Sequence, residues 1–120
     1  MSAKTVHRNK SGVKIFLTPD FALIGENMAS LDEEVKNCLD GNDLRLVIDF
    51  ELVPYIDSQG LEKLLEYYNQ VRIKGGSLEI FNPNPLCNEI LNITCITDYI
   101  DIYFNLEKAG WNSYEGRTSN

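Results

Sequence analysis

Hydrophobic residues occur first as short runs near the start of this chain and then at strand-like and helical spacings further along. Residues 13–17 form an apolar run that Thr18-Pro19-Asp20 closes, which predicts a strand. Residues 21–24 predict a second strand that Gly25 ends, so that the two strands would form an opening hairpin. The residues before the first run are mainly polar and predict no element.

A helix is expected over residues 27–40. Ser30 is a candidate N-cap because Glu33 follows three residues later, as in a capping box, and Gly41 is a typical stop. Residues 44–50 then form a nearly continuous apolar run that is β-branched at its centre. Such a run is typical of a strand that is buried on both faces of a parallel sheet.

The clearest helix follows the connection over residues 51–56. Its apolar residues recur three and four positions apart, and polar residues occupy the other side. The apolar positions are Leu61, Leu64, Leu65, Tyr68 and Val71. An amphipathic helix buries such a stripe, so these side chains are expected in the core. Gly75-Gly76 ends the helix.

Shorter elements complete the pattern. Residues 77–81 alternate as a strand, and the Asn-Pro-Asn-Pro sequence of residues 82–85 imposes a turn before a short helix over residues 86–93. Residues 99–104 predict a last strand, and residues 105–109 predict a final helical turn.

This alternation of strands and helices predicts a single α/β domain. We expect a mixed, largely parallel β-sheet of about four to five strands with about four helices. The length of 120 residues is within the range of one domain, and no linker or repeat interrupts it. The chain is divided into a polar N-terminal segment (1–12), the domain (13–110) and a polar C-terminal tail (111–120).

The charge balance is acidic, because 18 Asp and Glu residues outnumber 11 Lys and Arg residues, giving a net charge of −7. The basic residues are scattered singly, whereas proteins that bind nucleic acids or anionic membranes cluster them, so no nucleic-acid partner is expected. No apolar stretch has the length of a membrane span, and the first residues lack the core of a secretory signal. We therefore expect a cytoplasmic protein without direct membrane insertion.

Side chains that would support catalysis or metal binding are sparse. His7 is the only histidine and lies in the polar N-terminal segment, and no nucleophile elbow or phosphate-binding glycine loop is present. An enzyme, a cofactor and a metal site are therefore not expected. An odd number of widely spaced cysteines predicts reduced thiols that serve in packing, namely Cys38, Cys87 and Cys95.

The segment Asp57-Ser58-Gln59-Gly60 lies where the chain leaves the central strand region and enters the strong helix. The Ser58 hydroxyl can accept from free backbone N–H groups there, and helix-start statistics alone favour a purely structural cap over a functional role. Gly60 permits the close approach either of a partner or of a neighbouring strand, and both interpretations stay open. Tyr55 and Ile56 are expected at the edge of any contact surface.

Residues 49–61, with the sequence DFELVPYIDSQGL, resemble the signature stretch of STAS domains, which are named for sulfate transporters and anti-sigma factor antagonists. The resemblance extends from about Leu44 to Ala109. In the free-standing bacterial members, the serine of this motif is phosphorylated by an anti-sigma factor that is itself a serine kinase. Ser58 is the matching position. The candidate partner-binding residues are Tyr55, Ile56, Asp57, Ser58, Gln59, Gly60 and Glu62.

The resemblance implies partner switching. The unphosphorylated antagonist binds the anti-sigma factor, the phosphorylated form releases it, and a metal-dependent, PP2C-type phosphatase restores the first state. A phosphate adds about −1.5 to −2 charges, which a helix N-terminus tolerates. Next to Asp57 and Glu62, the same charge would repel a partner surface shaped for a neutral hydroxyl.

Some positions depart from the family pattern. The Gly-x-Leu-Asp turn that many members carry after the early strand is not reproduced by residues 18–21 or by Gly25-Glu26, and Pro54 and Gln59 alter the edge of the expected contact surface. The alternative function is therefore kept open: a STAS accessory or scaffold subunit that does not cycle through phosphorylation, for example in a membrane lipid transporter or a signalling complex.

Overall fold

The computed structural model describes residues 2–9 and 12–104, and it describes side-chain burial from residue 14 onward. The strands are β1 (Ser2–Asn9), β2 (Gly12–Pro19), β3 (Arg45–Asp49), β4 (Ser77–Phe81) and β5 (Asp101–Tyr103). The helices are α1 (Ala29–Asp40), α2 (Ser58–Ile73) and α3 (Pro85–Ile93), with 3-10 turns η1 (Gly25–Asn27) and η2 (Ile96–Asp98).

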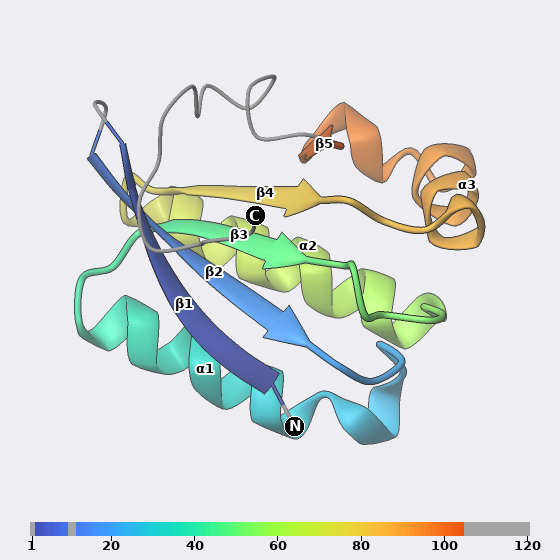
Figure 1. The fold of residues 1–120 in the computed structure, drawn as a ribbon, viewed down its shortest axis with the longest axis horizontal. Helices are drawn as coiled ribbons and strands as arrows, with labels where there is room; N and C mark the ends of the chain where they lie inside the picture. Colours follow the sequence, from blue (N-terminus) through green and yellow to red (C-terminus); the bar gives the residue numbers. More distant parts are fainter. Residues whose placement is uncertain (1, 10–11, 105–120) are drawn as a thin grey trace.

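The five strands form one sheet in the order β1-β2-β3-β4-β5 (Figure 1). β1 and β2 are antiparallel, whereas β2, β3, β4 and β5 are parallel neighbours that helical connections join. The predicted α/β class and the mixed, largely parallel sheet are therefore confirmed. The described residues contain three α-helices, and the fourth predicted one, over residues 105–109, lies outside them.

One face of the sheet carries the main core. α1 and α2 lie against this face, on the far side of the sheet in Figure 1, and α3 lies beyond the carboxyl end of β4. Leu46, Ile48 and Ile80 point into this layer and are at most 1% exposed. On α2, Leu64 and Val71 are fully buried and Leu61, Leu65 and Tyr68 pack against the cluster, so the predicted apolar stripe is confirmed.

The opposite face of the sheet carries a smaller apolar cluster. Phe16, Val47 and Phe81 are neighbours across β2, β3 and β4, and the rings of Phe16 and Phe81 meet edge to face. Lys14 lies on the same face and forms an ion pair with Glu79, with 2.8 Å between Nζ and Oε1. Tyr103 on β5 packs against this cluster.

The start of the chain differs from the sequence prediction. Ser2–Asn9 pairs along its whole length with β2 and forms the edge of the sheet, so most of the segment set apart as residues 1–12, including His7, belongs to a strand. Residues 21–24 do not form a strand, because β2 already has β1 and β3 as neighbours. Only Leu23 makes an isolated parallel bridge, to Ile56.

The helix ends follow the sequence more closely. α1 begins at Ala29 with Met28 as its N-cap and no side-chain cap, so the prediction that Ser30 caps this helix is wrong. Gly41 ends α1 as predicted. α2 ends at Ile73, and Gly75 follows with φ of +86°, a conformation that glycine adopts without strain.

The three cysteines are free thiols, but only two are packing residues. Cys38 and Cys87 are buried in the main core, and burial raises the pKa of the Cys87 thiol. Cys95 is exposed, so the prediction of a packing role is wrong for this residue. Among the described helices, none is both long and apolar enough to span a membrane.

Candidate functional site

Ser58 is the first residue of α2, and its side chain is exposed. The cap of this helix is Asp57, whose Oδ1 accepts from the Gly60 N–H at 2.9 Å, so the prediction that Ser58 itself is the N-cap is wrong. A carboxylate at the N-cap satisfies the free amide and complements the helix dipole. Within the part of the chain that the structure describes, the Ser58 hydroxyl makes no hydrogen bond and faces solvent.

The backbone around Ser58 is held from the side of the β2–α1 connection. The Leu23 N–H donates to the Tyr55 carbonyl at 2.9 Å, and the Asp57 N–H donates to the Leu23 carbonyl at 3.2 Å. These two bonds make the short parallel bridge between Leu23 and Ile56. The residues immediately before Ser58 are therefore fixed relative to the connection that leads into α1.

A second set of contacts holds the same loop from the side of α3. Asn84 caps α3 by accepting from the Cys87 N–H at 2.7 Å. Its Nδ2 also donates to the carbonyls of Val53 and Pro54, at 3.2 and 3.3 Å. The Asn-Pro-Asn-Pro sequence predicted only a turn, and nothing in its pattern indicated that Asn84 supports the loop before Ser58.

Gly60 has a structural explanation. A Cβ at this position would lie 2.0 Å from the Leu23 carbonyl oxygen and 2.9 Å from Cγ1 of Ile56. Gly60 is buried, and Ile56 is only 1% exposed. Of the two interpretations left open for Gly60, the packing one is therefore supported. Ile56 does not lie at the edge of a contact surface as expected, because its side chain is part of the main core.

The other predicted partner-binding residues reach the surface. Tyr55 is 45% exposed, Ser58, Gln59 and Glu62 are exposed, and Asp57 is half-buried. Gln59 lies against the η1 turn, because a Cβ on Gly25 would meet its Oε1 at 1.6 Å. The exposed members therefore surround Ser58 at the carboxyl edge of the sheet.

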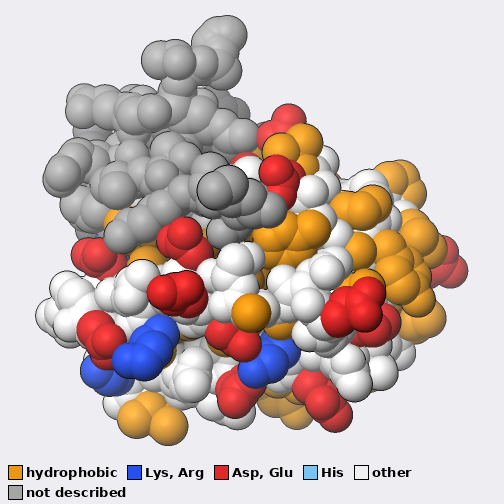
Figure 2. Space-filling view, turned by 90° about the horizontal axis from the view of Figure 1, so that it is seen from below, with side chains coloured by type: hydrophobic (Ala, Val, Ile, Leu, Met, Phe, Trp, Pro, Cys, Tyr) orange, Lys and Arg blue, Asp and Glu red, His pale blue; other side chains and the backbone are white. Residues whose placement is uncertain are grey.

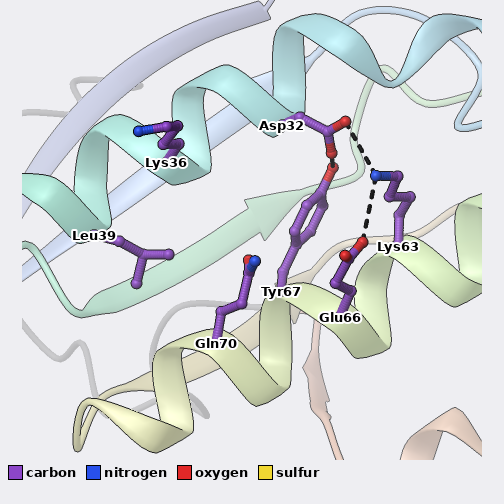
Figure 3. Close-up of a pocket in the computed structure, with 7 residues that line it drawn as sticks. All are labelled: Asp32, Lys36, Leu39, Lys63, Glu66, Tyr67 and Gln70. Carbon is purple, nitrogen blue, oxygen red and sulfur yellow. Dashed lines mark hydrogen bonds and ion pairs between the residues drawn. The ribbon is translucent and has the colours of Figure 1, made fainter.

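A separate groove of about 290 Å³ lies between α1 and α2 (Figure 3). The Tyr67 hydroxyl donates to Asp32 Oδ1, and Lys63 bridges Asp32 Oδ2 and Glu66 Oε1 at 3.2 and 3.3 Å. Burial, and then the bond to Asp32, raise the pKa of Tyr67, and the bond to Asp32 raises the pKa of Lys63. These four side chains satisfy one another and join α1 to α2. We call Asp32, Lys63, Glu66 and Tyr67 the clamp.

Within residues 2–9 and 12–104, no three His, Cys, Asp or Glu side chains are grouped so that they could hold a metal ion.

The family model for the STAS domain matches residues 4–109. The chain therefore belongs to the STAS domain family. No curated protein matches the chain significantly. Among solved structures, a putative anti-sigma factor antagonist from Thermotoga maritima matches with a TM-score of 0.77 and 19% identity, covering 89% of this chain and 91% of that one.

Two further structures have the same fold. The anti-sigma factor antagonist SpoIIAA in its unphosphorylated form matches with a TM-score of 0.70 and 14% identity, covering 91% of this chain and 94% of that one. An anti-sigma factor antagonist from Mycobacterium paratuberculosis matches with a TM-score of 0.69 and 18% identity, covering 91% of each chain. At these identities the likeness establishes the fold.

Proposed function

We propose that this chain is an anti-sigma factor antagonist, a non-enzymatic module that binds an anti-sigma factor serine kinase while Ser58 is unmodified and releases it once Ser58 is phosphorylated. The observation that carries the proposal is the exposed Ser58 hydroxyl at the start of α2, in a member of the STAS family. Structures with this fold include SpoIIAA in both its unphosphorylated and its phosphorylated form. A cytoplasmic location fits this role.

The folded domain can accommodate a phosphate at Ser58. The first amides of a helix have no carbonyl partner one turn earlier, and the dipole favours an anion at this end. Asp57 already accepts from the Gly60 N–H, which leaves the Ser58 and Gln59 amides at the open end of α2. Phosphorylation therefore adds charge at a place where the fold tolerates it.

A bound partner would not tolerate the same charge. Asp57 is adjacent to Ser58 in the chain, and Glu62 is one turn further along α2. Adding about two negative charges between these carboxylates changes a surface with separated acids into one concentrated anion. A partner surface shaped for a neutral hydroxyl would then lose a hydrogen bond and meet strong repulsion.

The chemistry is supplied by the partners. The kinase would transfer the γ-phosphoryl group of ATP to the Ser58 oxygen, with ADP leaving and the hydroxyl proton passing to the kinase. A PP2C-type phosphatase would hydrolyse the phosphoserine to restore Ser58 and release phosphate. The chain itself contributes position and exposure of the hydroxyl.

Intact-mass measurement after incubation with the cognate kinase and ATP tests this proposal. We expect a gain of one phosphate on the wild-type chain, none on Ser58→Ala, and an unchanged gain on Ser30→Ala. Ser30 is a matched control because it is also exposed in the first turn of a helix that begins at the same edge of the sheet. No gain on the wild-type chain would favour the alternative, a STAS accessory or scaffold subunit that does not cycle.

A further inference from the structure

Three large apolar side chains are exposed close to the Ser58 end of the molecule. Leu52 is 55% exposed, Tyr55 is 45% exposed and Leu86 is 50% exposed. Leu52 and Tyr55 belong to the loop between β3 and α2, and Leu86 belongs to the first turn of α3. We call these three residues the apolar patch. Figure 2 shows hydrophobic side chains gathered at the end of the molecule where α3 and this loop lie.

The patch spans two segments that are fixed to one another. The bonds from Asn84 to the carbonyls of Val53 and Pro54 join the residue before α3 to the loop before α2. Cys87 adds a contact from its sulfur to the Val53 carbonyl at 3.7 Å. The residues on either side of Leu86 are therefore hydrogen-bonded to the segment that contains Leu52 and Tyr55. A rigid apolar surface loses little conformational entropy on binding.

The charged residues of the two stretches that carry the patch all have one sign. The sequence has no Lys, Arg or His between residues 46 and 62 or between residues 75 and 104. The exposed Glu51, Glu62 and Glu89 lie in these two stretches. The cations that flank these stretches are Arg45, at the start of β3, Lys63, in the second turn of α2, and Lys74, just after the end of α2. Lys63 is paired with Asp32 and Glu66, and Arg45 and Lys74 lie at the opposite edge of the sheet.

We infer that the apolar patch is the hydrophobic anchor of the partner interface, and that the partner is a protein that presents an apolar pocket bordered by Lys or Arg side chains. This inference rests on the proposed function, because it assigns the patch to the same kinase that reads Ser58. Apolar anchors at the centre of an interface contribute most of its binding energy, whereas the surrounding charges speed association and select the partner. The acidic border disfavours nucleic acid and anionic membranes as occupants.

The inference separates the lasting attraction of the interface from the switch at Ser58. The anchor and the acids supply attraction that is present in both states of Ser58. The phosphate acts only at the edge of the surface where the Ser58 hydroxyl lies, and there we expect the partner to present a neutral contact without Lys or Arg, so that the added charge weakens binding. Binding of the unmodified chain should therefore weaken with rising salt and, separately, with loss of the patch.

Affinity for the purified kinase, measured by calorimetry with the full-length chain, tests the inference. We expect Leu52→Ser/Leu86→Ser to raise Kd about 30-fold or more. The matched control is Ile73→Ser. Ile73 is 85% exposed but is the last residue of α2, about 22 Å from Ser58 along the helix axis. This variant should leave Kd within about twofold. Circular dichroism and the thermal midpoint check that both variants fold.

The outcomes separate the inference from the proposed function. Binding by the wild-type chain that Ser58→Asp abolishes but the patch variant retains would overturn the inference and leave the function standing. Failure of the wild-type chain to bind the kinase would overturn both. A wild-type dimer in sedimentation that the patch variant dissociates, with kinase affinity unchanged, would assign the patch to a second copy of the chain and also overturn the inference.

Discussion

α1 and α2 begin at the same edge of the sheet, and each carries an exposed serine in its first turn, but their surroundings differ. α1 starts after Met28 without a side-chain cap, and Ser30 is its second residue. α2 starts after Asp57, which caps it, and the loop before Ser58 is bonded on both sides, to Leu23 and to Asn84. The two serines are thus both exposed, but only Ser58 follows a loop that is hydrogen-bonded to two other segments.

The largest difference is expected in partner binding. Ser58→Asp should weaken affinity for the kinase about 100-fold, because a carboxylate replaces a neutral hydroxyl beside Asp57 and Glu62. Ser30→Asp places the same charge at the start of α1 and should change affinity less than about twofold. Calorimetric titration of both variants tests the comparison, and equal losses would show that general negative charge, not the position of Ser58, controls binding.

A large effect on stability is expected at Gly60. Gly60→Ala forces a Cβ towards the Leu23 carbonyl oxygen and should lower the free energy of unfolding by about 2–3 kcal/mol. Gly41→Ala is the control at the end of α1, where the nearest atom is 3.3 Å away and φ is −85°, and it should change stability by less than about 1 kcal/mol. Urea unfolding measures both variants. An unchanged free energy of unfolding for Gly60→Ala would refute the close approach between Gly60 and the Leu23 carbonyl.

A moderate effect is expected from the cap. Asp57→Ala removes the acceptor of the Gly60 N–H and should cost about 1 kcal/mol of stability. Ser30→Ala removes no cap and should change stability by less than about 0.5 kcal/mol. Thermal unfolding of the two variants under identical conditions gives the comparison. A larger loss for Ser30→Ala would restore Ser30 as the cap of α1.

The smallest effect concerns the clamp between the two helices. Tyr67→Phe removes the bond to Asp32, which Lys63 still pairs, and should cost about 0.5 kcal/mol at neutral pH. The pKa of Tyr67 is raised in the folded state, so its stabilisation is fully present below the unfolded value of about 10 and is lost as pH rises above it. Urea unfolding between pH 7 and 11 should show a smaller alkaline loss for the variant. An identical pH dependence would contradict a contribution from Tyr67.

Much of this fold could be predicted from the sequence, because apolar periodicity reports burial directly. The stripe of α2 and the strands β3 and β4 followed from spacing alone. β1 could not be predicted, because a polar edge strand has no such period and depends on pairing with β2. Residues 21–24 were assigned to a strand because they form an apolar run. They do not form one because both edges of β2 are already paired, with β1 and with β3.

The candidate site was predicted in part. The family motif located Ser58, and local spacing located the start of α2. Asp and Ser are both common N-cap residues, so the sequence Asp57-Ser58 does not show which of the two caps α2. The backbone geometry decides this. Leu52 and Leu86 were missed because an exposed leucine has the same sequence signature as a buried one.

The most direct test is to purify the chain phosphorylated at Ser58 and to measure its Kd for the kinase and its thermal midpoint beside those of the unmodified chain. We predict an affinity lower by about 100-fold or more and a midpoint shifted by less than about 4 °C, because the open start of α2 accepts the charge that the partner rejects. Equal affinities would contradict a switch at Ser58. A large fall in the thermal midpoint that accompanies the loss of affinity would show that phosphorylation acts by unfolding the domain.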